Sequence, residues 1–200
     1  PEQDLWQYIP INTWNGKIAN QFCPNSVKTM MTINVKDPWA QRWILSTSEG
    51  INWAKSMNLA PSDQPILFTP SESCEQGESE PLIQFVNLSD NTELKSPMTE
   101  IYAVVNDPAG IRNFSLEFGS GWEPEEWYVI ASYPNRSVIQ PEKIGDWNLT
   151  GLENGPYTLR IFVESSSGHY SEQRIHVMVN VEQDPHGNEG ILVPVYGDQS

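Results

Sequence analysis

The chain has 200 residues, and its 26 acidic against 11 basic side chains give a formal net charge of −15. An acidic surface without a run of Lys or Arg argues against binding to nucleic acid or to anionic lipid through phosphate charge. No apolar run approaches the ~20 residues that a membrane-spanning helix needs. The 16 prolines and 13 glycines favour many short strands over long helices. Because the sequence begins at Pro1 without Met, we interpret it as a fragment of a longer protein.

The first 35 residues predict short strand pieces in an irregular segment. Residues 11–19 indicate a strand, a turn at Asn15-Gly16 and a second strand. Asp37 and Pro38 then form a good helix start, as N-cap and first helical residue, and a second short helix is expected from Ser48 to about Leu59. The stretch from 61 to 80, rich in Pro, Ser and Glu, is interpreted as a linker, with a domain boundary near Glu78.

The two cysteines, Cys23 and Cys74, both stand in loop-like surroundings. A metal site would need more ligands at short spacing, and the three histidines lie far along the chain. We therefore favour a disulfide, which indicates an oxidising compartment, over two unpaired thiols. No metal and no cofactor is expected.

From residue 82 onward the pattern predicts about seven strands in roughly a hundred residues, the size of an immunoglobulin-like β-sandwich. Ile101, Ala103 and Val105 should face inward, and the run from 114 to 118 alternates apolar residues with Ser115 and Glu117. The expected division of the chain is a disulfide-closed segment with short helices over 1–78, the sandwich over 79–183 and an acidic tail over 184–200. The fold class is thus mainly β.

The stretch 146–164 organises the sandwich. The side chains of Tyr157, Leu159, Ile161 and Val163 alternate with polar ones, Thr158 among them, as in a strand with one face on a core and the other in water. A turn of Glu, Asn, Gly and Pro precedes this strand. The predicted structural core consists of Trp127, Trp147, Tyr157, Leu159 and Ile161.

Few residues in the sequence are candidates for catalysis or for ligand binding. Glu123, Glu125 and Glu126 could form a carboxylate pair for glycoside hydrolysis, although an exposed acidic loop is the simpler interpretation. Trp122, beside a Gly-rich loop, is the best candidate for stacking on a sugar ring. The alternative is that the tryptophans serve the core. No catalytic residue is predicted.

The segment 110–160 is similar to an immunoglobulin-like module that is appended to bacterial cell-surface proteins, including penicillin-binding proteins. It carries Leu116-Glu117-Phe118-Gly119-Ser120-Gly121, then Trp127 and Trp147, then Gly151-Leu152-Glu153-Asn154-Gly155-Pro156-Tyr157-Thr158-Leu159-Arg160. Phe118 and Leu149 depart from the pattern of that module. Upstream, Gly16-Lys17-Ile18-Ala19-Asn20-Gln21-Phe22-Cys23-Pro24 resembles the tail that follows the transpeptidase domain of class A penicillin-binding proteins, the bifunctional peptidoglycan glycosyltransferase/transpeptidases.

The resemblance implies the non-catalytic carboxy-terminal region of such an enzyme. No serine has a lysine three residues on, Lys-Thr-Gly is absent, and Ser89-Asp90-Asn91 spells the middle transpeptidase motif without its partners. We expect an extracytoplasmic spacer or docking region of a membrane-anchored peptidoglycan synthase in the bacterial cell wall, not itself membrane-spanning. Peptidoglycan or other cell-wall proteins would be its partners. The alternative is a carbohydrate-binding module using Trp122.

Overall fold

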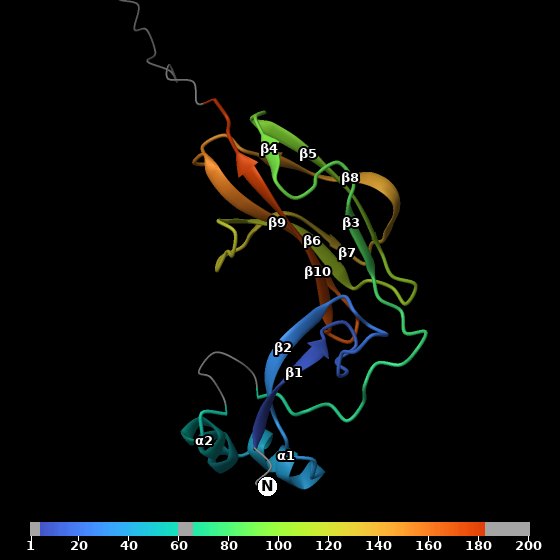
Figure 1. The fold of residues 1–200 in the computed structure, drawn as a ribbon, viewed down its shortest axis with the longest axis vertical. Coiled ribbons are helices and arrows are strands. Elements are labelled where there is room, and N and C mark those ends of the chain that lie inside the picture. The colour runs from blue at the N-terminus through green and yellow to red at the C-terminus, as the bar shows by residue number, and fades with distance from the viewer. Residues whose placement is uncertain (1–4, 60–65, 183–200) are drawn as a thin grey trace, which may run out of the picture.

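The computed structural model describes residues 5–59 and 66–182, and these form ten strands and two helices (Figure 1). Elements of the N-terminal segment are β1 (Trp6–Asn12), β2 (Val27–Ile33), α1 (Pro38–Ser46) and α2 (Ser48–Ser56). Elements of the sandwich are β3 (Leu82–Phe85), β4 (Thr92–Leu94), β5 (Met98–Asn106), β6 (Asn113–Ser120), β7 (Tyr128–Pro134), β8 (Val138–Asn148), β9 (Gly155–Glu164) and β10 (Tyr170–Val179). The expected acidic tail, 184–200, lies outside the described residues. The mainly β fold class is confirmed.

The strand pairing of the N-terminal segment differs from the predicted hairpin. β1 pairs with β2 in antiparallel register, whereas the residues after the Asn15-Gly16 turn reach β1 only through one bridge, between Ile11 and Ile18. The turn is held by the side chain of Asn12, whose Oδ1 accepts hydrogen bonds from the amides of Trp14 and Asn15. These two hydrogen bonds satisfy backbone amides of the turn itself. The main partner strand of β1 is then β2, which comes later in the chain.

Both short helices begin as the sequence predicts. The Asp37 carboxylate accepts a hydrogen bond from the amide of Ala40, and Pro38 is the first residue of α1. The Thr47 hydroxyl caps α2 by accepting from Gly50. A Cβ at Gly50 would lie 2.3 Å from the carbonyl oxygen of Trp43, so the tight connection between the helices requires glycine here. Their apolar faces bury Ile44 and Ala54 in a small core that also holds Ile33 and Leu59.

The described part of the predicted linker belongs structurally to the N-terminal segment. Residue Ile33 of β2 exchanges backbone hydrogen bonds with Leu67 and Thr69, and Ile18 does so with Glu72 and Cys74. The chain therefore lies along the segment as a strap over 66–80 before β3 begins. Its proline-rich composition does not leave it free, because its amides and carbonyls find partners on both sides.

The sandwich consists of a five-stranded sheet in the order β4-β10-β9-β6-β7 and a three-stranded sheet in the order β3-β5-β8. All pairs are antiparallel except β10 with β4. The short β4 was not among the predicted strands, and the long β8 was predicted only near its end, around Trp147. The two inner faces enclose one core, whose largest fully buried side chains include Phe114, Ile101, Leu116 and Ile144.

The predicted inward faces of two strands are buried. Ile101, Ala103 and Val105 of β5 have no exposed surface, and the same holds for Leu159, Ile161 and Val163 of β9. Trp147 is 2% and Tyr157 7% exposed, and their rings meet edge to face with centroids 6.0 Å apart. These residues are the centre of the sandwich core.

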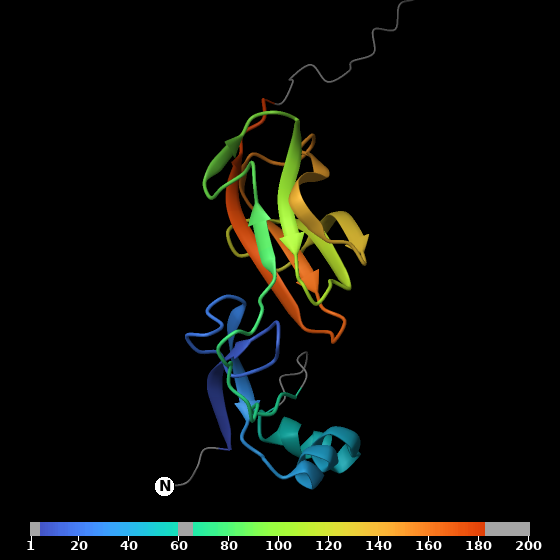
Figure 2. The ribbon, with the colours of Figure 1, turned by 90° about the vertical axis from the view of Figure 1, so that its right-hand side faces the viewer.

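The N-terminal segment and the sandwich are joined end to end, which gives the molecule an elongated form (Figures 1 and 2). Trp14 belongs to the segment by sequence but inserts into the sandwich core, where it is 8% exposed. The carbonyl of Thr13 accepts a 2.9 Å hydrogen bond from the amide of Tyr170, and the hydroxyls of Ser26 and Ser171 lie 2.6 Å apart. The junction is thus a packed and hydrogen-bonded interface.

Candidate functional site

The loop 121–127, which carries the proposed sugar-stacking residue Trp122, folds over the outer face of the five-stranded sheet. The Thr158 hydroxyl, from β9, donates to the carbonyls of Gly121 (2.8 Å) and Trp122 (3.2 Å). A Cβ at Gly119 would lie 2.3 Å from the Cβ of Pro124, so glycine allows the loop to press against the sheet. Thr158 is consequently fully buried, whereas the alternation in the sequence predicted that it faces water.

Trp122 itself is 43% exposed at the edge of this loop. Its ring meets that of His176 edge to face, with centroids 5.3 Å apart, and its carbonyl lies 3.2 Å from His176 Nε2. On the other side of that imidazole, Nδ1 lies 3.3 Å from Asp90. Part of the Trp122 indole therefore remains on the surface, and the His176 ring packs against it and fixes its orientation. An exposed aromatic ring held in one orientation is what a sugar-stacking platform requires.

The middle motif Ser89-Asp90-Asn91 serves as a turn. The Asp90 carboxylate accepts a hydrogen bond from the amide of His176, and Asn91 has a positive φ of 65°. The Ser89 carbonyl accepts from the hydroxyl of Thr92 at 2.7 Å. These contacts connect the β4 turn to β10 and give the serine no activating base.

Trp127 is not a core residue, and this prediction was wrong. Its ring lies on the outer face of the sheet above two arginines, with the guanidinium carbons of Arg160 and Arg174 at 3.9 Å and 5.1 Å from the ring centroid. The alternation of β7 begins after this residue, and the preceding loop carries it to the opposite side of the sheet from Trp147. Trp127 therefore makes cation–π contacts with two guanidinium groups instead of filling the core.

A chain of charged side chains under Trp127 is the polar centre of this outer face. Arg160 contacts Glu117 at 2.6 Å and Glu172 at 3.2 Å, and Arg174 contacts Glu172 at 2.7 Å. The Ser115 hydroxyl donates to the other oxygen of Glu117 at 2.5 Å. Ser115 and Glu117 are 5% and 8% exposed, although their alternation with apolar residues suggested solvent exposure. Because each buried carboxylate meets a guanidinium, the cluster satisfies its own charge.

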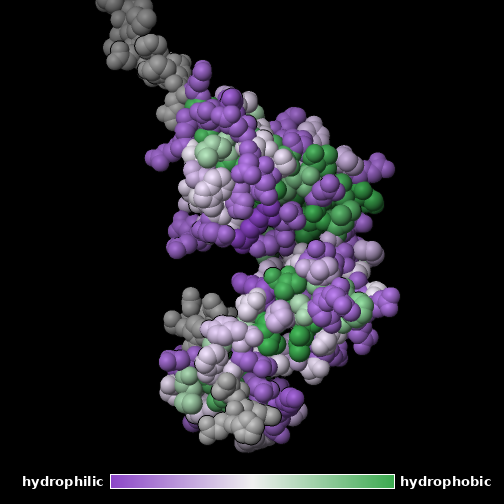
Figure 3. All heavy atoms as spheres, in the orientation of Figure 1, coloured by the Kyte–Doolittle hydropathy of each residue, from purple (hydrophilic) through white to green (hydrophobic). Residues whose placement is uncertain are grey.

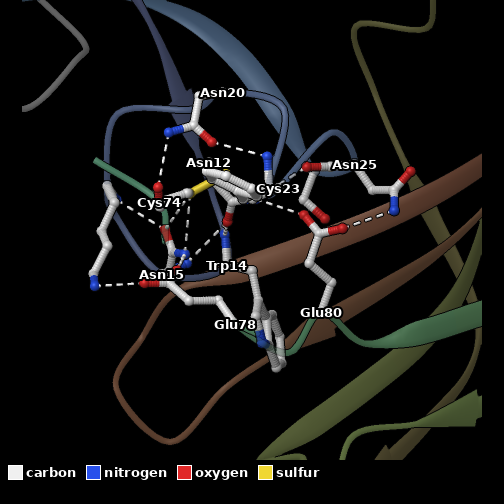
Figure 4. Close-up of a disulfide and its surroundings, with 12 residues drawn as sticks. Asn12, Trp14, Asn15, Asn20, Cys23, Asn25, Cys74, Glu78 and Glu80 are labelled. Atoms are coloured by element: carbon white, nitrogen blue, oxygen red, sulfur yellow. Dashed lines mark hydrogen bonds and ion pairs between the residues drawn. A yellow bond between two sulfur atoms is a disulfide. The ribbon is translucent and has the colours of Figure 1, made fainter. Parts of the chain in front are cut away.

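The predicted disulfide between Cys23 and Cys74 is confirmed, with Cα atoms 6.1 Å apart and a sequence separation of 51 residues. Figure 4 shows that asparagine and glutamate side chains surround it and fasten the strap to the N-terminal segment. Glu78 accepts from Asn15 (2.5 Å) and from Lys17 (2.6 Å). Further along, Glu80 accepts from Asn12 and Asn25, both at 2.7 Å. The bridge and this network together close the segment just before β3.

The other chemical candidates are dispersed. Glu123 is largely exposed, and within the described part of the chain its only ion pair is a 3.7 Å contact with Arg174. Glu125 is exposed, and Glu126 accepts from the hydroxyl of Tyr128. Within residues 5–59 and 66–182, no group of three or more His, Cys, Asp or Glu side chains is arranged to hold a metal ion, and no helix is long and apolar enough to span a membrane.

No protein-family model and no curated protein matches this sequence. Among solved structures, a polysaccharide monooxygenase of type CBM33 is 14% identical with a TM-score of 0.36, over 45% of this chain and 60% of that one. CopC from Methylosinus trichosporium OB3b is 15% identical with a TM-score of 0.31, over 52% and 98% of the two chains. Murine CRIg is 12% identical with a TM-score of 0.31, over 52% and 100%. At TM-scores this low, the likenesses carry no argument about function, which must come from the residues of the chain itself.

Proposed function

We propose that this chain is a non-catalytic spacer and docking region of an extracytoplasmic peptidoglycan synthase of the class A penicillin-binding type. The observation that supports the proposal most is the junction, where Trp14 enters the sandwich core and Thr13 bonds to Tyr170. Two units fixed end to end keep a set separation, which is the property a spacer needs. The Cys23–Cys74 bridge favours an oxidising compartment and so an extracytoplasmic location.

The test of a stiff spacer is whether the two units tumble together. Backbone ¹⁵N relaxation should give the N-terminal segment and the sandwich the same rotational correlation time. Trp14→Ala should separate the two values, because it removes the side chain that joins the cores. Trp39→Ala is the matched control, since Trp39 is 73% exposed on α1 and should leave the tumbling unchanged. Independent tumbling of the unmodified protein would contradict a spacer role.

A second experiment concerns the absence of catalysis. The purified chain, incubated with a fluorescent penicillin, should remain unlabelled, because a transpeptidase serine needs a neighbouring lysine and the Lys-Thr-Gly motif. A functional class A enzyme serves as the positive control. Covalent labelling of this chain would overturn the non-catalytic assignment.

The second candidate function is carbohydrate binding, and the partly exposed indole of Trp122 favours it. Sedimentation with insoluble peptidoglycan distinguishes the two: a binder is pulled down, and a pure spacer stays in the supernatant. If Trp122 is the platform, Trp122→Ala should abolish sedimentation and Trp39→Ala should not. Sedimentation that survives Trp122→Ala would assign the binding to another surface.

A further inference from the structure

A pocket of about 430 Å³ lies at the junction of the two units, where β2 meets the first residues of β10. Its lining includes Ser26 and Lys28 of the N-terminal segment and Tyr170, Glu172, Gln173 and Arg174 of β10. Its volume falls within the range of small-ligand sites, and Figure 3 shows the surface hollowed between the sandwich and the N-terminal segment. Because the lining comes from both units, the pocket exists only in the joined molecule.

Two polar groups of the lining have no partner among the described residues. The Lys28 ammonium makes no ion pair, and the Tyr170 hydroxyl makes no hydrogen bond. The Tyr170 hydroxyl can donate, because a phenol is protonated at neutral pH and partial burial raises the pKa of Tyr170 further. In a chain with only 11 basic side chains, a pocket lined by both a free ammonium and a free phenol is suited to an anion.

Arg174 adds a cation whose pairing is incomplete. Its Nη2 contacts Glu172 at 2.7 Å, whereas among residues 5–59 and 66–182 its Nη1 reaches only the exposed Glu123, at 3.7 Å. A carboxylate from a ligand can replace that long contact at little cost, since Glu123 is 87% exposed and returns to water.

The rest of the lining fits a sugar. The ring of Tyr170 is stacked on that of Phe162, with centroids 5.3 Å apart, and is thereby held in place. The carboxylate of Glu172, the amide of Gln173 and the hydroxyl of Ser26 offer acceptors and donors for sugar hydroxyls around it. An aromatic ring with polar groups at its border is the usual composition of a small polar-ligand site.

We propose that the junction pocket binds a carboxylate-bearing saccharide, with the ligand carboxylate at Lys28, Arg174 and the Tyr170 hydroxyl. This inference rests on the proposed cell-wall function, because peptidoglycan strands from which the stem peptide has been removed supply such a sugar acid. It differs from the Trp122 hypothesis in site and in chemistry, since Trp122 would stack on any pyranose, whereas the junction pocket selects for negative charge.

The test uses two free sugars that differ by one acidic substituent: N-acetylmuramic acid, which carries a lactyl carboxylate, and N-acetylglucosamine, which does not. In ¹H–¹⁵N spectra of the whole chain, N-acetylmuramic acid should shift the amides of Lys28, Tyr170 and Gln173. N-acetylglucosamine should shift them at least about tenfold more weakly, because it lacks the charge-assisted hydrogen bonds. Raising the salt concentration should weaken the binding of N-acetylmuramic acid only.

Two conservative variants identify the groups responsible. Lys28→Ala should weaken N-acetylmuramic acid binding about tenfold, and Tyr170→Phe should weaken it by a smaller factor while keeping the ring stack. Lys55→Ala, at an exposed lysine of α2 far from the pocket, is the matched control. Equal shifts by both sugars, no shift at the junction, or full binding by Lys28→Ala would overturn the proposal. Its failure would leave the penicillin and relaxation results unaffected, so the spacer function is tested separately.

Discussion

The hydroxyl of Tyr157 donates a 3.1 Å hydrogen bond to the carbonyl oxygen of Glu153, four residues earlier in the chain. The ring packs into the core and is 7% exposed, while its polar end closes the turn that leads into β9. This is the tyrosine-corner arrangement of immunoglobulin-like sandwiches. Burial raises the pKa of Tyr157 above its usual value near 10, so the hydroxyl remains a donor well into the alkaline range.

Tyr157→Phe should lower the free energy of unfolding by about 1 kcal/mol, the typical net contribution of one hydrogen bond. The aromatic ring and its contact with Trp147 remain, so no large cavity forms. Urea denaturation followed by tryptophan fluorescence measures the difference. A loss above about 3 kcal/mol would mean that the hydroxyl does more than close this corner.

Trp147→Ala should bring the sandwich close to unfolding. The side chain is 2% exposed, and truncating a buried aromatic typically costs about 3–5 kcal/mol of a total of ~5–15 kcal/mol. Trp147→Phe should cost less, since the indole Nε1 has no hydrogen-bond partner among the described residues that would be lost.

Trp122→Ala is the exposed comparison for that experiment and should cost under about 1 kcal/mol. Urea denaturation of the three variants measures how much free energy of unfolding each one loses. A larger loss for Trp122→Ala than for Trp147→Ala would contradict the placement of these two residues inside and outside the sandwich.

Glu117→Ala should destabilise the fold by about 3 kcal/mol, because it leaves the guanidinium of Arg160, whose side chain is 16% exposed, without its shortest partner. Replacing both residues with Met should cost less than the single change, since no unpaired charge is buried. Lys95→Gln, in a surface pair with Glu93, should leave the midpoint of urea denaturation nearly unchanged. Equal effects of Glu117→Ala and Lys95→Gln would remove the case for a buried ion network.

The strap should loosen in acid. The hydrogen bond from Lys17 lowers the pKa of Glu78 below its usual 4.5, so the ionised carboxylate stabilises the folded segment above the unfolded pKa. That contribution is lost as the pH falls through the lowered folded pKa. Hydrogen exchange at the Cys74 amide, which donates to the carbonyl of Ile18, should therefore gain protection from pH 3 to 6 after correction for intrinsic rates.

Lys17→Gln should flatten this pH dependence, because it removes the main cause of the lowered pKa. At the alkaline end, Glu78 and Glu72 raise the pKa of Lys17, and that contribution disappears only as the pH rises through the raised value. A protection profile of the Cys74 amide that is the same in the variant would show that the Lys17–Glu78 contact does not hold the strap.

The disulfide should stabilise the chain by about 4 kcal/mol on the chain-entropy model, given its 51-residue separation. Reduction should raise the intact mass by two hydrogens, and alkylation without reductant should fail. Two alkylated cysteines in the native, unreduced protein would contradict the bridge. Cys23→Ser with Cys74→Ser should unfold at lower urea than the unmodified protein.

Local patterns in the sequence predicted a good part of this fold. The period of two from Tyr157 to Val163 and the caps at Asp37 depend on neighbours a few residues away, and both the buried strand face and the helix start follow from them. The disulfide was predicted because too few potential metal ligands lie close to the two cysteines in the sequence for a metal site. The β8 strand was predicted only around Trp147, because its solvent-facing middle, with Pro141, lacks an apolar alternation.

The candidate site was harder to predict because it depends on one loop. Thr158 and Glu117 alternate with apolar residues as solvent-facing positions do, and only the return of residues 121–127 over the sheet buries them. The same return carries Trp127 away from the core. The junction pocket likewise joins Lys28 to Tyr170, which are far apart in sequence, and no motif marks either one.

The disulfide also determines how the chain would carry a mechanical load. Tension applied at the two ends passes from β1 through Cys23 directly to Cys74 and on to β3, because a covalent bond bypasses the residues between them. The two helices lie inside that bypassed loop, so pulling on the chain would not unwind them. The residues before Cys23, which include β1, the end of the strap from 75 to 81 and the strands of the sandwich would bear the force.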